Sequence, residues 1–206
     1  GEHEDVAIAM SDHYRPRFAG DELPRNIAGC VVAVADKLDT IAGMFAIDEP
    51  PTGSKDPFAL RRSAIGILNI LREKLHIGYE ELVPVALEAY AEQGIEFDAG
   101  AVCASVCAFI KGRLEQMARD EKIDADTVAA VSAGSVSAPV DYFALAHALK
   151  DARDSDADTF DNLATAYARA SHLADADLGV DVDASLLGDA ERELLQASDA
   201  AQAAVD

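Results

Sequence analysis

Two aspartates three residues apart are the first candidates for a chemical site. Asp36 and Asp39 lie in a stretch of helical periodicity, so both carboxylates would project from one helical face. Such a pair could contribute to a metal site or to acid–base chemistry, but a metal needs further ligands from other segments. His13 is the upstream residue that could supply one. The interpretation we favour is simpler: an Asp–Lys–Asp polar edge on an amphipathic helix.

The cysteines and the remaining histidines give weaker signals. Cys103 and Cys107 are four residues apart, but their neighbours are apolar and no histidine is close in sequence. We therefore expect small buried hydrophobic residues rather than metal ligands. Three further histidines have no recurring acidic or nucleophilic partner: His76, His147 and His172. With no Ser-His-Asp or Cys-His arrangement, the sequence predicts neither catalytic nor metal-binding residues.

Basic and aromatic residues alternate at two places in the first third of the chain. They are Tyr14, Arg15, Arg17, Phe18, Lys55, Phe58, Arg61 and Arg62. Cations can hold RNA phosphates while aromatic rings stack on bases, so the pattern is compatible with RNA binding. The alternative is intramolecular: the arginines pair with Asp21, Glu22 or Asp56 and fix the geometry of their loops.

Helices must position all of these residues. Apolar residues recur every three or four positions and strand patterns are nearly absent, so we predict an all-α fold, a helical bundle. Asp98 can cap the helix that follows it, and three prolines and a glycine make a loop of 48–57. The helices are expected at about residues 25–47, 58–75, 79–93, 99–117, 125–132, 142–153, 159–173 and 184–204.

Length and composition bound the class of protein. With 206 residues, half of them hydrophobic, the chain can form one large helical domain or two small ones. It has no apolar run of the roughly 20 residues that cross a bilayer, and three cysteines do not make a disulfide framework. We therefore expect a cytoplasmic protein with no membrane partner. The start at Gly1 suggests a piece of a longer chain.

The charge is strongly negative and unevenly distributed. The formal net charge is −21, yet the first 75 residues hold 9 basic and 12 acidic residues, whereas the rest hold 8 and 26. This excess repels nucleic-acid phosphates at long range. Any binding to nucleic acid needs a local basic patch, and the first third is where we expect it.

Three segments carry a family resemblance. They read SDHYRPRFAGDELP at 11–24, VADKLDT at 34–40 with a glycine three residues on, and PTGSKDPFALRR at 51–62. In order and spacing they resemble signatures of the bacterial glycyl-tRNA synthetase β subunit, over about residues 5–71. Residues 108–114 are similar to a further family stretch, with Gly112 where aspartate is usual. Residues 163–172 resemble another, with Ala168 in place of lysine and His172 in place of asparagine.

The resemblance implies a heterotetramer of two α and two β subunits that attaches glycine to its tRNA, with ATP and Mg used by the intact enzyme. The α subunit would hold the aminoacylation site and the β subunit would recognise glycine tRNA, not DNA. Residues 1–53 are similar to the end of an HD-like helical domain, and residues 54–206 to a truncated anticodon-binding region. The chain alone would be non-catalytic and would hold no cofactor.

Charge, position and resemblance together select the candidate tRNA contacts. They are Arg15, Arg17, Lys55, Arg61, Arg62, Lys111, Arg113 and Arg169. A helical scaffold that docks the α subunit is the alternative function. A remnant of a metal-dependent HD phosphohydrolase, with Asp36 as its last ligand, is less favoured because the helices that carry the other ligands in that family are missing here.

Overall fold

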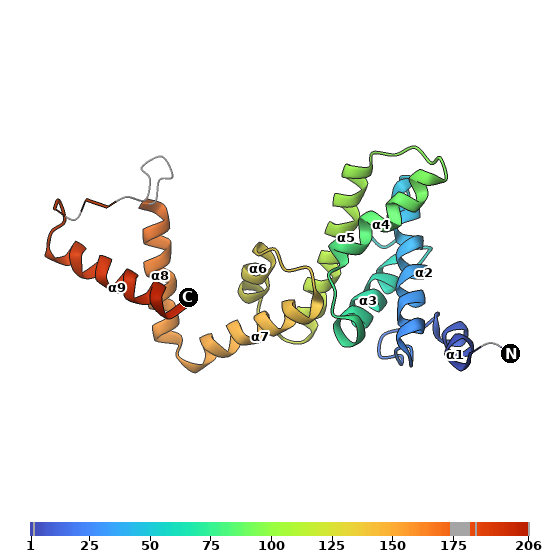
Figure 1. The fold of residues 1–206 in the computed structure, drawn as a ribbon, viewed down its shortest axis with the longest axis horizontal. Helices are drawn as coiled ribbons and strands as arrows, with labels where there is room; N and C mark the ends of the chain where they lie inside the picture. The colour runs from blue at the N-terminus through green and yellow to red at the C-terminus, as the bar shows by residue number, and fades with distance from the viewer. Residues whose placement is uncertain (2, 174–181, 184, 206) are drawn as a thin grey trace. The chain divides into compact units, whose positions relative to one another are not determined.

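The fold is all-α, as the sequence predicts (Figure 1). The computed structural model describes residues 1, 3–173, 182–183 and 185–205, and within these ranges it contains no β-strand. Its helices are α1 (Glu4–Asp12), α2 (Ile27–Ala46), α3 (Leu60–Ile70), the π-helical turn η1 (Leu71–Leu75), α4 (Tyr79–Glu92), α5 (Ala99–Asp120), α6 (Ala125–Ala133), α7 (Pro139–Ser155), α8 (Ala157–Leu173) and α9 (Asp189–Val205). None of the described helices is long and apolar enough to cross a membrane.

The chain forms two compact units, Gly1–Ala157 and Asp158–Asp206. The first holds α1 to α7 and the hydrophobic core, and the second holds α9 and nearly all of α8. The expected boundary between residues 53 and 54 falls inside the first unit, between α2 and α3, which pack against each other. The division of the chain into an HD-like part and an anticodon-binding part stays a prediction.

Helix α2 is the centre of the first unit. It contacts α1, α3, α4 and α5, and its residues Cys30 and Ile41 are fully buried. Apolar positions of α5 also face this core, where Val106, Ile110 and Leu114 are fully buried. The apolar periodicity of these two helices therefore arises from a shared core.

Side-chain caps explain where the main helices begin. The Asn26 side chain accepts a hydrogen bond of 2.8 Å from the Gly29 amide at the start of α2. Asp98 accepts one of 2.9 Å from the Ala101 amide and caps α5, as predicted. Helix α1 was not predicted from the sequence. Only Ala9 and Asp12 of this helix are buried, and its apolar pattern is therefore weak.

The predicted helix of 58–75 is interrupted by a change of helix type. Helix α3 continues into the π-helical turn η1, which ends at His76 in the left-handed conformation, with φ of 53°. The guanidinium of Arg72 in this turn lies 3.6 Å from the centre of the Phe143 ring and pairs with Glu121. In such a turn the backbone hydrogen bonds span five residues instead of the four of an α-helix.

Candidate nucleic-acid interface

Asp12 anchors the loop that carries Arg15 and Arg17. Its carboxylate is 1% exposed and accepts hydrogen bonds from the Arg25 backbone amide at 3.0 Å and from the Arg25 Nε at 2.8 Å. The Arg15 Nε lies 3.7 Å from the same carboxylate. The side-chain hydrogen bonds from Arg25 hold the pKa of Asp12 well below its usual range. An ionised Asp12 thus ties the two ends of the loop together.

A buried lysine also holds this loop through hydrogen bonds to its backbone. Lys37 on α2 is 7% exposed, and its ammonium donates to the carbonyls of His13 at 3.2 Å and of Arg15 at 3.0 Å. Burial lowers the pKa of Lys37. The flanking Asp36 and Asp39 are exposed. The two aspartates are therefore exposed, as expected for a polar helix edge, but the lysine between them is buried.

Asp36 and Asp39 are not joined by a third metal-ligating residue within the described part of the chain. Within the part of the chain that the structure describes, no group of three or more His, Cys, Asp or Glu residues could hold a metal ion. The His13 Nδ1 lies 2.8 Å from the Met10 carbonyl. Cys103 and Cys107 are half-buried and pack against the core, and burial raises the pKa of the Cys107 thiol.

Three of the candidate arginines are engaged in pairs with nearby acidic residues. The Arg17 Nε lies 2.9 Å from a carboxylate oxygen of Asp21, whose pKa the same arginine lowers. Arg15 pairs with Glu22. Arg61 donates to the Gly53 carbonyl at 2.8 Å and lies 3.9 Å from Asp56. The intramolecular alternative is confirmed for these three arginines, which shape the loops around them.

Three other candidates keep a side chain without a described ion pair or hydrogen bond. Lys55 is exposed at a turn that its backbone closes with Thr52, at 2.7 and 3.1 Å. Arg62 is exposed on α3, one residue after the engaged Arg61. Arg169 is exposed on α8 in the second unit. Among the candidate residues, these three are the exposed cations that remain available to an anionic ligand.

The two candidates on α5 are half-buried. The Lys111 ammonium donates to the Ser132 carbonyl at 2.6 Å and so holds α5 to the end of α6. The Arg113 Nε is buried without a hydrogen-bond partner in the described structure. Lys111 therefore has a structural contact that the sequence did not reveal, because Ser132 lies 21 residues away.

The structure brings Phe18 and Arg62 to one pocket, which the sequence analysis did not predict. The pocket has a volume of about 240 Å³ and is lined by the loop after Arg15 and by one face of α3, including Asn69. Arg62 and Asn69 are seven residues apart on the helix, a spacing that returns to the same face. The spacing of Arg62 and Asn69 could have indicated from the sequence that they share a face. No feature of the sequence indicated that Phe18 lies in the same pocket.

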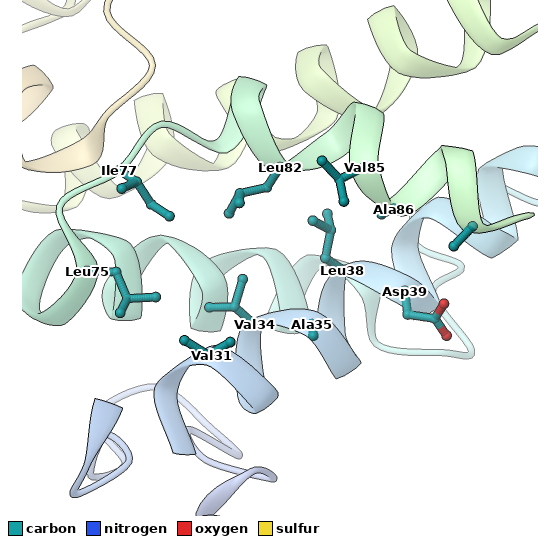
Figure 2. Close-up of a pocket in the computed structure, with 11 residues that line it drawn as sticks. Val31, Val34, Ala35, Leu38, Asp39, Leu75, Ile77, Leu82, Val85 and Ala86 are labelled. Atoms are coloured by element: carbon teal, nitrogen blue, oxygen red, sulfur yellow. The ribbon is translucent and has the colours of Figure 1, made fainter. Parts of the chain in front are cut away.

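An apolar groove lies between α2 and α4 (Figure 2). It has a volume of about 360 Å³, and Asp39 is the one charged residue among those that line it. Leu38 of α2 points toward Val85 of α4 across the groove (Figure 2). Val31 and Val85 are 52% and 64% exposed, so the apolar face of α2 is only partly covered by the core.

Comparison with known proteins gives consistent matches. A family model described as glycyl-tRNA synthetase beta subunit matches residues 1–133. The glycine–tRNA ligase beta subunit of Actinobacillus pleuropneumoniae serotype 5b is 39% identical over 199 residues, which are 95% of this chain. That of Escherichia coli K12 is 41% identical over 195 residues, or 93% of this chain. The chain spans only about 28% of the length of each relative.

Proposed function

Because the chain belongs to the glycyl-tRNA synthetase beta subunit family, we propose that it is a tRNA-recognition part of a heterotetrameric glycine–tRNA ligase. In this proposal the ligase acts in the cytoplasm and attaches glycine to tRNA with ATP and Mg²⁺, and the alpha subunit carries out that chemistry. The described residues include no cluster suited to a metal ion. In this proposal the chain carries out no catalytic step and only binds and orients the tRNA.

The observation that carries this proposal is the family match together with the unpaired cations Lys55 and Arg62. Both lie within or beside the proline-rich loop, in a part of the chain with little net charge. Cations that make no internal ion pair can contact phosphates without losing an existing partner. The acidic remainder of the chain would repel phosphates elsewhere and so favour one orientation of the tRNA.

Fluorescence anisotropy of labelled glycine tRNA, titrated with the 206-residue chain at low and moderate salt, tests this proposal. We expect saturable binding that weakens with salt and is weaker for a tRNA with an altered anticodon. The double variant Lys55→Gln/Arg62→Gln should lower the slope of log affinity against log salt by about 2, one for each lost phosphate contact. Absence of saturable binding at low salt would refute direct recognition by this chain.

The second candidate function is a scaffold that docks the alpha subunit, and the apolar groove between α2 and α4 favours it. An equimolar mixture with the alpha subunit on a sizing column would show co-elution. Val85→Glu should abolish that co-elution, because it places a charge in the groove on a side chain that is already 64% exposed.

The phosphohydrolase alternative has no ligand cluster among the described residues to support it, and a manganese-dependent phosphatase assay tests it.

A further inference from the structure

The pocket beside α3 combines three kinds of recognition group. The Phe18 ring is 56% exposed. The Arg62 guanidinium has no ion pair within the described residues, and the half-buried Asn69 side chain makes no described hydrogen bond. The pocket therefore presents an aromatic face, a full positive charge and an amide that can both donate and accept.

The loop that lines one side of this pocket is held in place by α3 and by Lys37. A Cβ atom on Gly66 would lie 3.4 Å from the Pro16 ring and 3.2 Å from the Lys37 side chain, so the loop packs tightly on α3. Lys37 also binds the carbonyls on either side of Tyr14, just before Pro16. Because the loop is already ordered, a ligand would lose little affinity to ordering it.

We propose that this pocket binds one unstacked nucleotide of RNA. The base would lie on the Phe18 ring, Arg62 would contact its phosphate, and Asn69 would hydrogen-bond to the edge of the base. Proteins recognise single-stranded RNA through this combination of an aromatic platform, a cation and a polar side chain. The inference rests on the proposed tRNA recognition and names the element that would perform part of it.

A second cation lies near the same ring. The Arg17 guanidinium carbon is 5.8 Å from the centre of the Phe18 ring, and Asp21 holds that guanidinium in place. Because Asp21 offsets the charge of Arg17, Arg62 is the cation of this pocket that remains available to a phosphate. The matched variants for a test are therefore Phe18→Leu, which keeps an apolar side chain but removes the ring, and Arg62→Gln.

The test uses the 206-residue chain with two probes: labelled glycine tRNA, and a short single-stranded RNA compared with the same strand carrying abasic sites. Phe18→Leu should weaken tRNA binding roughly 5- to 150-fold, the range of one base–aromatic stack. It should also remove the preference of the wild type for the strand with bases. Arg62→Gln should weaken both probes and lower the salt slope by about 1.

A charge-matched control separates the pocket from the overall charge. Arg119→Gln on α5 removes one positive charge from a side chain that pairs with Glu115 and does not line the pocket. We expect it to change tRNA affinity less than about twofold, and all three variants to keep the melting temperature of the wild type within a few degrees, since exposed side chains contribute little to stability.

The outcomes distinguish the pocket from the proposed function. If the wild type binds tRNA but Phe18→Leu and Arg62→Gln bind as Arg119→Gln does, the pocket inference is wrong and the tRNA function stands. Single-strand binding that depends on Phe18, without tRNA binding, would support the pocket and refute the proposed function. If the wild type binds neither RNA, both are wrong.

Discussion

At Asp12, one carboxylate with almost no exposed surface joins both ends of the loop that precedes α2. It accepts hydrogen bonds from the Arg25 backbone and guanidinium, and a hydrogen bond to a charged group contributes about 1.5–3 kcal/mol. The loop has few buried apolar residues of its own. Its shape therefore depends on this ion pair and on Lys37 more than on hydrophobic packing.

Asp12→Asn should lower the free energy of unfolding at neutral pH by about 1–3 kcal/mol, because it removes the charge that the Arg25 guanidinium faces. The pKa of Asp12 is lower in the folded state than its value of about 3.9 in unfolded chains. Its contribution is therefore present above about pH 4 and is lost as the pH falls toward the folded-state pKa.

Urea unfolding of wild type and Asp12→Asn between about pH 2.5 and pH 6 checks this prediction. The difference in unfolding free energy should be largest at the upper end of this range and should shrink in acid. Asp21 and Asp124 also have lowered pKa values, so the Asp12→Asn variant should keep some loss of stability in acid. A difference that does not depend on pH would assign the effect of Asp12 to packing instead.

The neighbours Arg61 and Arg62 show where prediction from single residues ends. In the sequence they are adjacent and identical cations. Either residue could contact RNA or pair with an acidic residue of the same chain. The structure separates them because consecutive residues of α3 point about 100° apart. Arg61 reaches back to Gly53 and Asp56, whereas Arg62 faces the pocket with Phe18. That outcome depends on how the loop folds over the start of the helix.

Among the elements, α2 and α4 meet at Gly43, against which the Tyr90 side chain of α4 packs. A Cβ atom there would lie 2.3 Å from the hydroxyl oxygen of Tyr90, which donates a hydrogen bond of 3.0 Å to the Asp39 carbonyl. The glycine three residues after Thr40 was part of the family resemblance in the sequence. The structure gives a physical reason for it: only a residue without a side chain leaves room for the Tyr90 ring.

Gly43→Ala should destabilise the first unit by about 1–2 kcal/mol, because the Tyr90 ring must move and lose its hydrogen bond. The loss is smaller than the clash alone would cause, since alanine favours a helix interior by about 1 kcal/mol over glycine. Thermal unfolding followed by circular dichroism measures the change.

The control for this prediction is the same substitution in a Tyr90→Ala background. There the clash is gone, and Gly43→Ala should stabilise the protein through helix propensity alone. Destabilisation in both backgrounds would mean that the alanine methyl group meets something other than Tyr90.

The type and extent of most elements followed from the sequence, because the apolar period and the Asp98 cap are local signals. The π-helical turn and the open groove did not. Both depend on how distant segments come together: Arg72 contacts Phe143 and Glu121, and the groove lies between α2 and α4. A period of 3.6 shows which residues share a face, but not whether another helix covers all of it.

At the scale of the whole molecule, the core and the charge are divided unequally between the two compact units. The core cluster lies entirely within residues 30–146, and no residue of α8 is buried. Residues 158–206 contain 2 basic and 11 acidic residues, which accounts for −9 of the net charge of −21. Arg169 and Arg192 are thus the two cations of a strongly acidic segment.

A chain of residues 1–157 should therefore keep a cooperative thermal transition within a few degrees of the full chain, because it retains the entire core. It should also bind glycine tRNA at least as tightly at low salt, where the repulsion from the removed acidic residues is least screened. Anisotropy at two salt concentrations checks the second expectation. Weaker binding by the shorter chain would instead indicate that a cation of the removed segment, Arg169 or Arg192, contacts tRNA.

The π-helical turn at Leu71–Leu75 has a consequence for how this segment can change over evolution. Such a turn holds one residue more than the α-helical path between the same two ends. Deleting one residue here would restore an ordinary α-helix, but Arg72 and Phe143 would no longer meet in the same way. Every later residue up to the loop would also rotate by about 100° relative to α3. A gap of one position in this stretch of an alignment would therefore mark a lineage whose α7 contacts this turn through different residues.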